Sequence, residues 1–449
     1  DSDLELKKLS LANKFNLKKI FQNIKKKIRF DNHKIKINYN KKILQINGVG
    51  KILLQENNDE LSYSFIKKEK NFSFKSNIKI NNNPLILDFM NFKKKKNSKL
   101  IIEINGTRNS KNTTQLDLIS FKENENKLSI TNLALNEKFN VIDLEAVKAY
   151  YVDQDNIQNK FAIKMKNNIY RLEGLSLNIN KLVDNLINND EKSNILKKNF
   201  KLDININKLF LDKETSLNKF IGTLTFNNQD IVNGKITAQF SNNKKLKFTV
   251  ETNKDEKITT LFLDKAVPIV NRYKFIKGFE EGVLDFYSTK QGKNSFSTVK
   301  IYDFKLKELP ALTKLLTLAS LQGIADLLSG EGIRFNEFEM NFTNQGDLMT
   351  IEEIYAIGPA ISVLMSGYVE KNKLISLRGT LVPATTINKA IGSIPVLGKI
   401  LVGSKTGEGV FGVSFKIKGP PKNLETTVNP IKTLTPRFIT RTLEKIKKN

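Results

Sequence analysis

The sequence predicts a mainly β protein whose strands form an antiparallel sheet, with a few short amphipathic helices near the C-terminus. Short runs of alternating apolar and polar residues recur at spacings of about eight to twelve residues along most of the chain, which is typical of an all-β array. Helical spacing of apolar residues is confined to a few short stretches, the clearest of them beyond residue 309. The hydrophobic content of 39% is below the roughly 45–50% usual for globular domains. A sheet with one face in water accounts for this composition.

The alternating pattern starts near residue 35. The first clear strands are predicted over residues 35–39 and 43–46, and Asn47-Gly48 follows the second of them. Asn-Gly is the strongest short hairpin signal, so we expect a turn there and another at Asn105-Gly106. Further strands are expected over residues 72–80, 85–92, 100–104, 116–121 and 128–135.

A break in the alternation at residues 180–200 predicts a short helix followed by a polar loop. We therefore divide the chain into three parts, residues 1–190, 191–308 and 309–449. In the middle part, strands are expected over residues 202–211, 222–226, 236–240, 246–250, 261–263, 283–287 and 296–304, with a short helix over 267–273.

The last part combines helices with strands. Apolar residues at three- and four-residue spacing predict a helix over 312–328 with one apolar face, which we expect to close the end of the sheet. Strands are expected over 338–342 and 348–357, and a second apolar stretch over 387–401 predicts two short helical pieces. The period-two pattern predicts that Phe338, Met340, Phe342, Val413, Phe415 and Ile417 face a shared apolar interior.

The end of the chain, from Pro436 onward, predicts a small basic amphipathic helix. This helix either contacts an anionic membrane surface or a partner, or caps the sheet and exposes its charges to water. The contact residues would be Arg437, Phe438, Ile439, Arg441, Leu443, Lys445 and Ile446.

The charge balance is strongly basic. The formal net charge is +28, and the first hundred residues carry 24 basic and 9 acidic side chains. This excess predicts either attraction to an anionic partner or a solvated lysine-rich surface. Only eight of the 74 basic residues are Arg, and Arg makes the bidentate contacts that base recognition favours. We therefore expect no nucleic-acid partner, and we interpret the run Lys93 to Lys96 as a solvated turn.

The sequence offers no recognisable catalytic or metal-binding set. It contains no cysteine, which excludes disulfides and thiolate chemistry. Its single histidine, His33, lies in a turn-like stretch and is expected to be an exposed loop residue. Neighbouring carboxylates such as Glu352-Glu353 point to opposite faces of a strand. We therefore expect a protein that is not an enzyme and has no cofactor.

Four stretches of the last part carry a resemblance to a known family. They are Leu318 to Ile333, Gly379 to Ala384, Ile394 to Gly398, and Val428-Asn429-Pro430. Together they resemble the C-terminal region of AsmA-like proteins of the YhdP type, closely over residues 309–440 and loosely from residue 200.

The resemblance implies an elongated sheet curled into an apolar β-groove that carries phospholipids between the inner and outer membranes of a bacterial envelope. Phe338, Met340, Phe342, Val413, Phe415 and Ile417 would then bind lipid. The implied location is the periplasm, with anchoring in the inner membrane through a segment absent from this chain. The alternative is a structural or regulatory envelope scaffold that conducts no lipid.

Overall fold

The computed structural model describes residues 2–13, 18, 20–95, 97–110, 113–138, 140–188, 199–228, 230–272, 277–308, 313, 316, 330–383, 412–421 and 423–431. Within these residues the protein is mainly β, as the sequence predicts. Among the described strands, β6 and β7 pair with each other, and the other 24 are assigned to a single, mostly antiparallel sheet. The chain divides into two compact units, residues 1–231 and 232–449, and each is described separately. The division at residues 190 and 308 stays a prediction.

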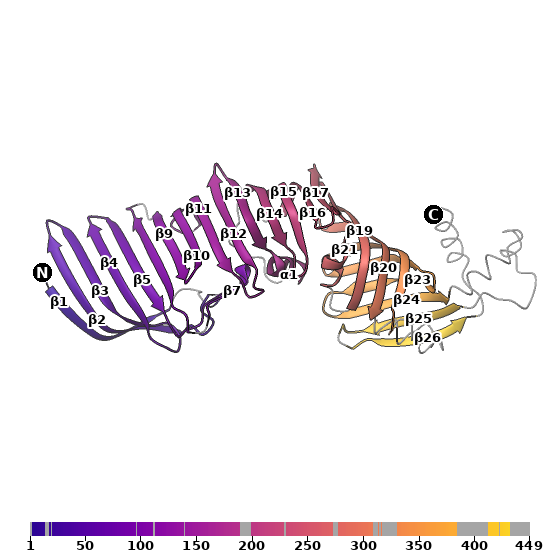
Figure 1. Cartoon of the computed structure of the whole chain (residues 1–449), viewed down its shortest axis with the longest axis horizontal. Helices are drawn as coiled ribbons and strands as arrows, with labels where there is room; N and C mark the ends of the chain where they lie inside the picture. Colours follow the sequence, from indigo (N-terminus) through magenta and orange to yellow (C-terminus); the bar gives the residue numbers. More distant parts are fainter. Residues whose placement is uncertain are drawn as a thin grey trace, which may run out of the picture. The chain divides into compact units, whose positions relative to one another are not determined.

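The first unit contains strands β1 to β15, and Figure 1 shows them in the order of the sequence from indigo to magenta. Most neighbouring strands are joined by short connections. The longer connections are residues 13–26 between β1 and β2, an insert of residues 81–99 between β5 and β8, and residues 179–199 between β13 and β14. The elements are β1 Ser2–Ala12, β2 Lys27–Asn40, β3 Ile43–Leu53, β4 Asp59–Lys68, β5 Asn71–Ile80, β6 Ile86–Leu87, the 3-10 helix η1 Asp88–Met90, β7 Phe92–Lys93, β8 Leu100–Arg108, β9 Thr114–Glu123, β10 Asn126–Leu135, β11 Val141–Val152, β12 Gln158–Lys166, β13 Ile169–Asn178, α1 Asn180–Asn188, β14 Phe200–Phe210 and β15 Ser216–Asn227.

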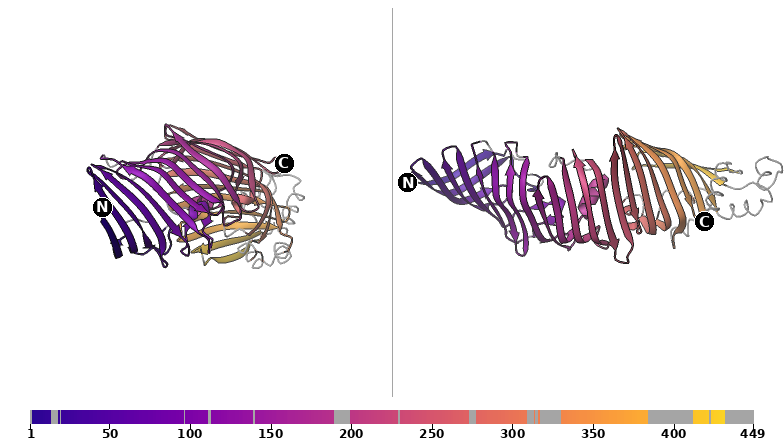
Figure 2. Two further views of the ribbon diagram at one scale, coloured as in Figure 1. Left: turned by 60° about the vertical axis from the view of Figure 1, so that its left-hand side comes forward. Right: turned by 90° about the horizontal axis from the view of Figure 1, so that it is seen from above.

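The second unit continues in the same manner, and Figure 2 shows its strands from a second direction. Its elements are β16 Asp230–Phe240, which starts at the unit boundary, β17 Lys245–Asn253, β18 Glu256–Leu263, α2 Val267–Val270, β19 Lys277–Gln291, β20 Asn294–Glu308, β21 Ile333–Gln345, β22 Leu348–Ile357, β23 Ile361–Glu370, β24 Leu374–Pro383, β25 Gly412–Gly419 and β26 Glu425–Ile431.

Pairing within each unit follows the order of the sequence. In the first unit, β5 pairs with β8 across the insert, and every pair but one is antiparallel. The exception is β13 with β14, which are parallel and are separated in the chain by α1 and residues 189–199. A parallel pair requires a crossover of this kind. No pairing between described residues joins the first strands of a unit to its last.

One predicted strand is wrong. Residues 85–92 do not form one strand, because the chain there makes the two-residue strands β6 and β7 with η1 between them. Asn91 takes a left-handed conformation, with φ 50°, and its amide donates to the Asp88 carbonyl. The short apolar run is therefore folded over the sheet instead of extended within it.

Candidate functional site: the apolar face of the sheet

One face of the first unit is apolar through every strand. Paired residues on neighbouring strands point to the same side of a sheet, so the register defines rows that cross it. One such row passes from Ile37 through Ile46, Phe65 and Phe74 to Gly106. The residues between these along each strand are mostly polar. We call the two sides the apolar face and the polar face; on the strands from β2 to β8 the apolar face carries Ile35, Ile37, Leu44, Ile46, Leu61, Tyr63, Phe65, Phe72, Phe74, Ile78, Ile80, Leu100, Ile102 and Ile104.

Glycines on the apolar face lie beneath aromatic rings. A Cβ added to Gly48 would lie 2.3 Å from Cζ of Tyr63, and one added to Gly106 would lie 3.1 Å from Cζ of Phe74. Both glycines are inside strands, so the predicted Asn-Gly turns are wrong. The reason is tertiary, since each glycine leaves room for the ring on the opposite strand, an arrangement known from other sheets.

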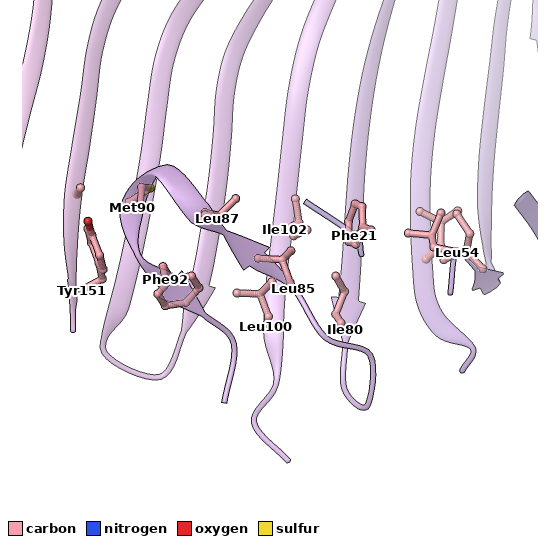
Figure 3. Packing of buried hydrophobic residues seen from close by; sticks show 13 residues of the cluster. Phe21, Leu54, Ile80, Leu85, Leu87, Met90, Phe92, Leu100, Ile102 and Tyr151 are labelled. Atoms are coloured by element: carbon pink, nitrogen blue, oxygen red, sulfur yellow. The ribbon is translucent and has the colours of Figure 1, made fainter. Parts of the chain in front are cut away.

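The apolar face ends in a buried base. Figure 3 shows side chains of the insert packed against the ends of the strands. Leu85 is 0% exposed, and it belongs to a cluster in which the insert also contributes Leu87, Met90 and Phe92. The strands contribute Ile52, Leu61, Ile80, Leu100, Ile102, Ala149 and Tyr151, and Phe21 and Leu54 come from the loops after β1 and β3. The insert therefore closes this end of the apolar face.

Hydrogen bonds of buried polar side chains hold the insert in place. The Asn83 amide donates to Asp59 Oδ2 over 2.7 Å, and the Lys94 ammonium donates to the Asn81 carbonyl over 2.6 Å. Burial raises the pKa of Asp59 and lowers that of Lys94, although Glu123 and Asp59 counteract the effect on Lys94. Lys94 is only 4% exposed, so the prediction of a solvated tetralysine turn is wrong for this residue. Its ammonium group holds the base of the insert in place through the hydrogen bond to the Asn81 carbonyl.

Away from the base, the apolar face is open to solvent. Leu4 of β1 is 51% exposed and Tyr39 of β2 is 69% exposed. Phe65 and Phe72 are half-buried, and their ring centroids lie 5.2 Å apart. At the strand ends opposite the base, Lys67 and Arg108 lie directly across from Phe72 on its two neighbouring strands. An apolar surface of this extent with a cationic rim suits an amphiphile that carries negative charge.

The second unit also has an apolar face, and it contains all six predicted lining residues. Register connects Met340 to Phe415 through Ile354, Met365 and Gly379. A second row, from Phe338 to Val413, and a third, from Phe342 to Ile417, run on either side of it.

These six side chains differ in exposure. Phe338, Met340 and Phe342 are half-buried, whereas Val413, Phe415 and Ile417 are 0%, 5% and 8% exposed. The Phe415 ring covers Gly379, where an added Cβ would lie 2.7 Å from Cζ. The shared face is therefore established, and whether it binds lipid stays a prediction.

His33 is not an exposed loop residue. It lies in β2 at a bulge, is 1% exposed, and its Nε2 donates to the Lys51 carbonyl over 2.9 Å. Its ring packs between Phe30 and Tyr63 on the apolar face, with centroid distances of 5.6 and 5.7 Å. His33 is two residues before Ile35 and therefore points to the same face of the sheet; the prediction was wrong because β2 begins at Lys27 and not near residue 35.

Several predicted features lie outside the described residues or produce no site within them. The terminal contact residues from Arg437 to Ile446, the helical pieces over 387–401 and nearly all of the helix over 312–328 are among those not described. In the part of the chain that is described, no helix has the length and apolar character to cross a bilayer, and no group of acidic or histidine side chains is placed to hold a metal ion.

Comparison with known proteins finds no matching family model, curated protein or solved structure.

Proposed function

We propose that this protein is a non-enzymatic lipid conduit whose apolar faces hold the acyl chains of phospholipids and let them move between the inner and outer membranes. The observation that supports this most directly is the apolar face of the first unit. It crosses every strand of the main sheet from β1 to β15, and much of it beyond the base is half-buried or exposed. The AsmA-like resemblance adds the envelope setting, in which the protein works from the periplasm.

The physical chemistry of the face fits acyl chains. Each methylene that leaves water contributes about 0.8 kcal/mol, so a diacyl lipid gains enough from the surface to stay on it. Neighbouring strands offer similar side chains along a cross-strand row, as Ile46, Phe65 and Phe74 do in one row. A lipid can therefore slide along the rows from strand to strand without a deep trap. In this proposal the sheet also curls around the lipid and forms an elongated groove.

The cationic rim would orient the bound lipid. The base buries one end of the strands, so acyl chains enter with their tips toward it. A phosphate headgroup would then lie at the other strand ends, beside Lys67 and Arg108. Charge attraction at this rim is modest in water and serves orientation more than affinity.

The test is to measure phospholipid that remains on the protein after purification in detergent-free buffer. Phe72→Asp with Phe74→Asp places two charges on the apolar face and should lower lipid content severalfold. The matched control is Ser62→Asp with Ser64→Asp, which adds the same charge to the polar face of the neighbouring strand. The absence of bound phospholipid in the unaltered protein would refute the proposal, as would equal lipid loss in both variants that remain folded by circular dichroism.

A specific observation favours a second candidate, an envelope scaffold that conducts no lipid. Val413, Phe415 and Ile417 are already buried by the protein itself, as expected for a sheet filled with its own side chains. The two functions differ in the first unit, where a scaffold has no need for exposed Leu4 and Tyr39. Phospholipid bound at the first unit therefore separates them.

A further inference from the structure

The polar face of the first unit carries a second feature, which concerns charge. One cross-strand row on this face can be followed through the register from β1 to β14. In its first half the charges alternate in sign: Lys8, Asp31, Lys51, Glu60, Lys79. Lys79 forms an ion pair with Glu60 at 3.2 Å. The net charge of these five side chains is only +1.

The second half of the row has charges of one sign. After Ile101 the register continues through Lys122, Lys127, Tyr150 and Lys160, and then through Ser176 to Lys208. All four lysines are exposed, and no acidic side chain interrupts them. Lys122 and Lys127 are directly opposite each other, an arrangement that destabilises an isolated sheet. We call these four lysines with Tyr150 the lysine row.

The surface around the lysine row is hollowed and partly apolar. An open hollow of about 680 Å³ has Lys127, Lys148, Tyr150, Lys160 and Leu175 among its lining residues. Tyr150 is 38% and Leu175 53% exposed. Glu173 is the acidic side chain in this lining. The described residues provide no ion pair for any member of the lysine row, and Lys208 instead lies 5.0 Å from the Phe210 ring centroid.

We infer that the lysine row docks the protein on an anionic phospholipid membrane. An anionic membrane attracts a protein in two ways: its phosphates attract positive charge, and its interface buries apolar and aromatic side chains. Within the described part of the chain, the lysines of the row have no acidic partner, and exposed tyrosine and leucine side chains lie beside them, so this surface fits both attractions. Lys supplies point charges suited to a diffuse layer of phosphates, whereas base recognition favours Arg. The row is on the opposite face from the apolar one, so this inference does not depend on lipid conduction.

The test is flotation of the full chain with vesicles that contain phosphatidylglycerol, compared with pure phosphatidylcholine vesicles. Lys127→Gln with Lys160→Gln removes two charges beside Tyr150, and binding to the anionic vesicles should weaken about 30-fold. The matched control is Lys34→Gln with Lys36→Gln, two exposed lysines of the same face that lie opposite Glu5 and Asp3. The control should change binding little, and high salt should reduce binding of the unaltered chain.

Four results would overturn the inference: no binding of the unaltered chain, no effect of either double variant, equal weakening by both, or tighter binding to duplex DNA that depends on the same lysines. The last result would assign the row to a nucleic acid. If Lys127→Gln with Lys160→Gln disturbs the circular dichroism spectrum, Lys122→Gln with Lys208→Gln repeats the test at the outer members of the row.

Discussion

Replacement of Phe415 by Ala tests the assignment of faces in the second unit. The side chain is 5% exposed, and its ring lies over Gly379 of the neighbouring strand. Removal of a buried phenylalanine ring costs about 3–5 kcal/mol, the lost transfer energy plus the cavity. The next residue, Lys416, is exposed and points to the other face.

The assay is urea denaturation followed by circular dichroism. Phe415→Ala should lower the free energy of unfolding of the second unit by about 3 kcal/mol or more, and Lys416→Ala by less than about 0.5 kcal/mol. If the two substitutions cost the same, or if Phe415→Ala costs under about 1 kcal/mol, the assigned faces are wrong. The result also shows whether a variant at Phe415 can be used to test lipid binding, because a variant that unfolds the sheet cannot report on lipid.

Three further predictions concern other parts of the chain. Gly48→Ala should destabilise the first unit by about 1–3 kcal/mol because the Tyr63 ring occupies the space of the new methyl group; in the Tyr63→Ala background that cost should shrink, and an unchanged cost would contradict the contact. Because burial raises the pKa of Asp59 in the folded state, its carboxylate binds protons more readily when folded; as pH rises from about 4 to 7, stability should therefore fall relative to Asp59→Asn, and a flat difference in urea unfolding would contradict this. Truncation after Thr435 should reduce flotation with anionic vesicles if the terminal basic residues make a membrane contact, and loss of folding on truncation would favour a cap.

The sequence predicted most strands because alternation is a local property. The strand expected over 348–357 has the same bounds in the structure, and the helix expected after residue 180 is present as Asn180–Asn188. The shared face of Phe338 and Phe415 also followed from the period of two. What alternation cannot reveal is which strands pair, and so the parallel pair β13 and β14 was missed.

The errors have tertiary causes. Gly48 is in a strand because Tyr63, 15 positions later in the sequence, occupies the space above it. His33 is buried because β2 extends back to Lys27, so that its ring packs between Phe30 and Tyr63, and Lys94 is buried because Asn81 provides a carbonyl for its ammonium. None of these partners is adjacent in sequence. The lysine row was hidden for the same reason, since its members are spread from residue 122 to residue 208 and meet only through register.

Photo-crosslinking at two adjacent positions tests the central claim most directly. Phe65 and Ile66 are both apolar and neighbours on β4, yet Phe65 is on the apolar face and Ile66, 37% exposed, is on the polar face. A photoreactive phenylalanine analogue at each position, with adducts identified by mass spectrometry, compares the two surfaces in cells. We predict phospholipid adducts at position 65 and few at position 66. No adduct at position 65, or equal yields at both, would contradict lipid binding by the apolar face.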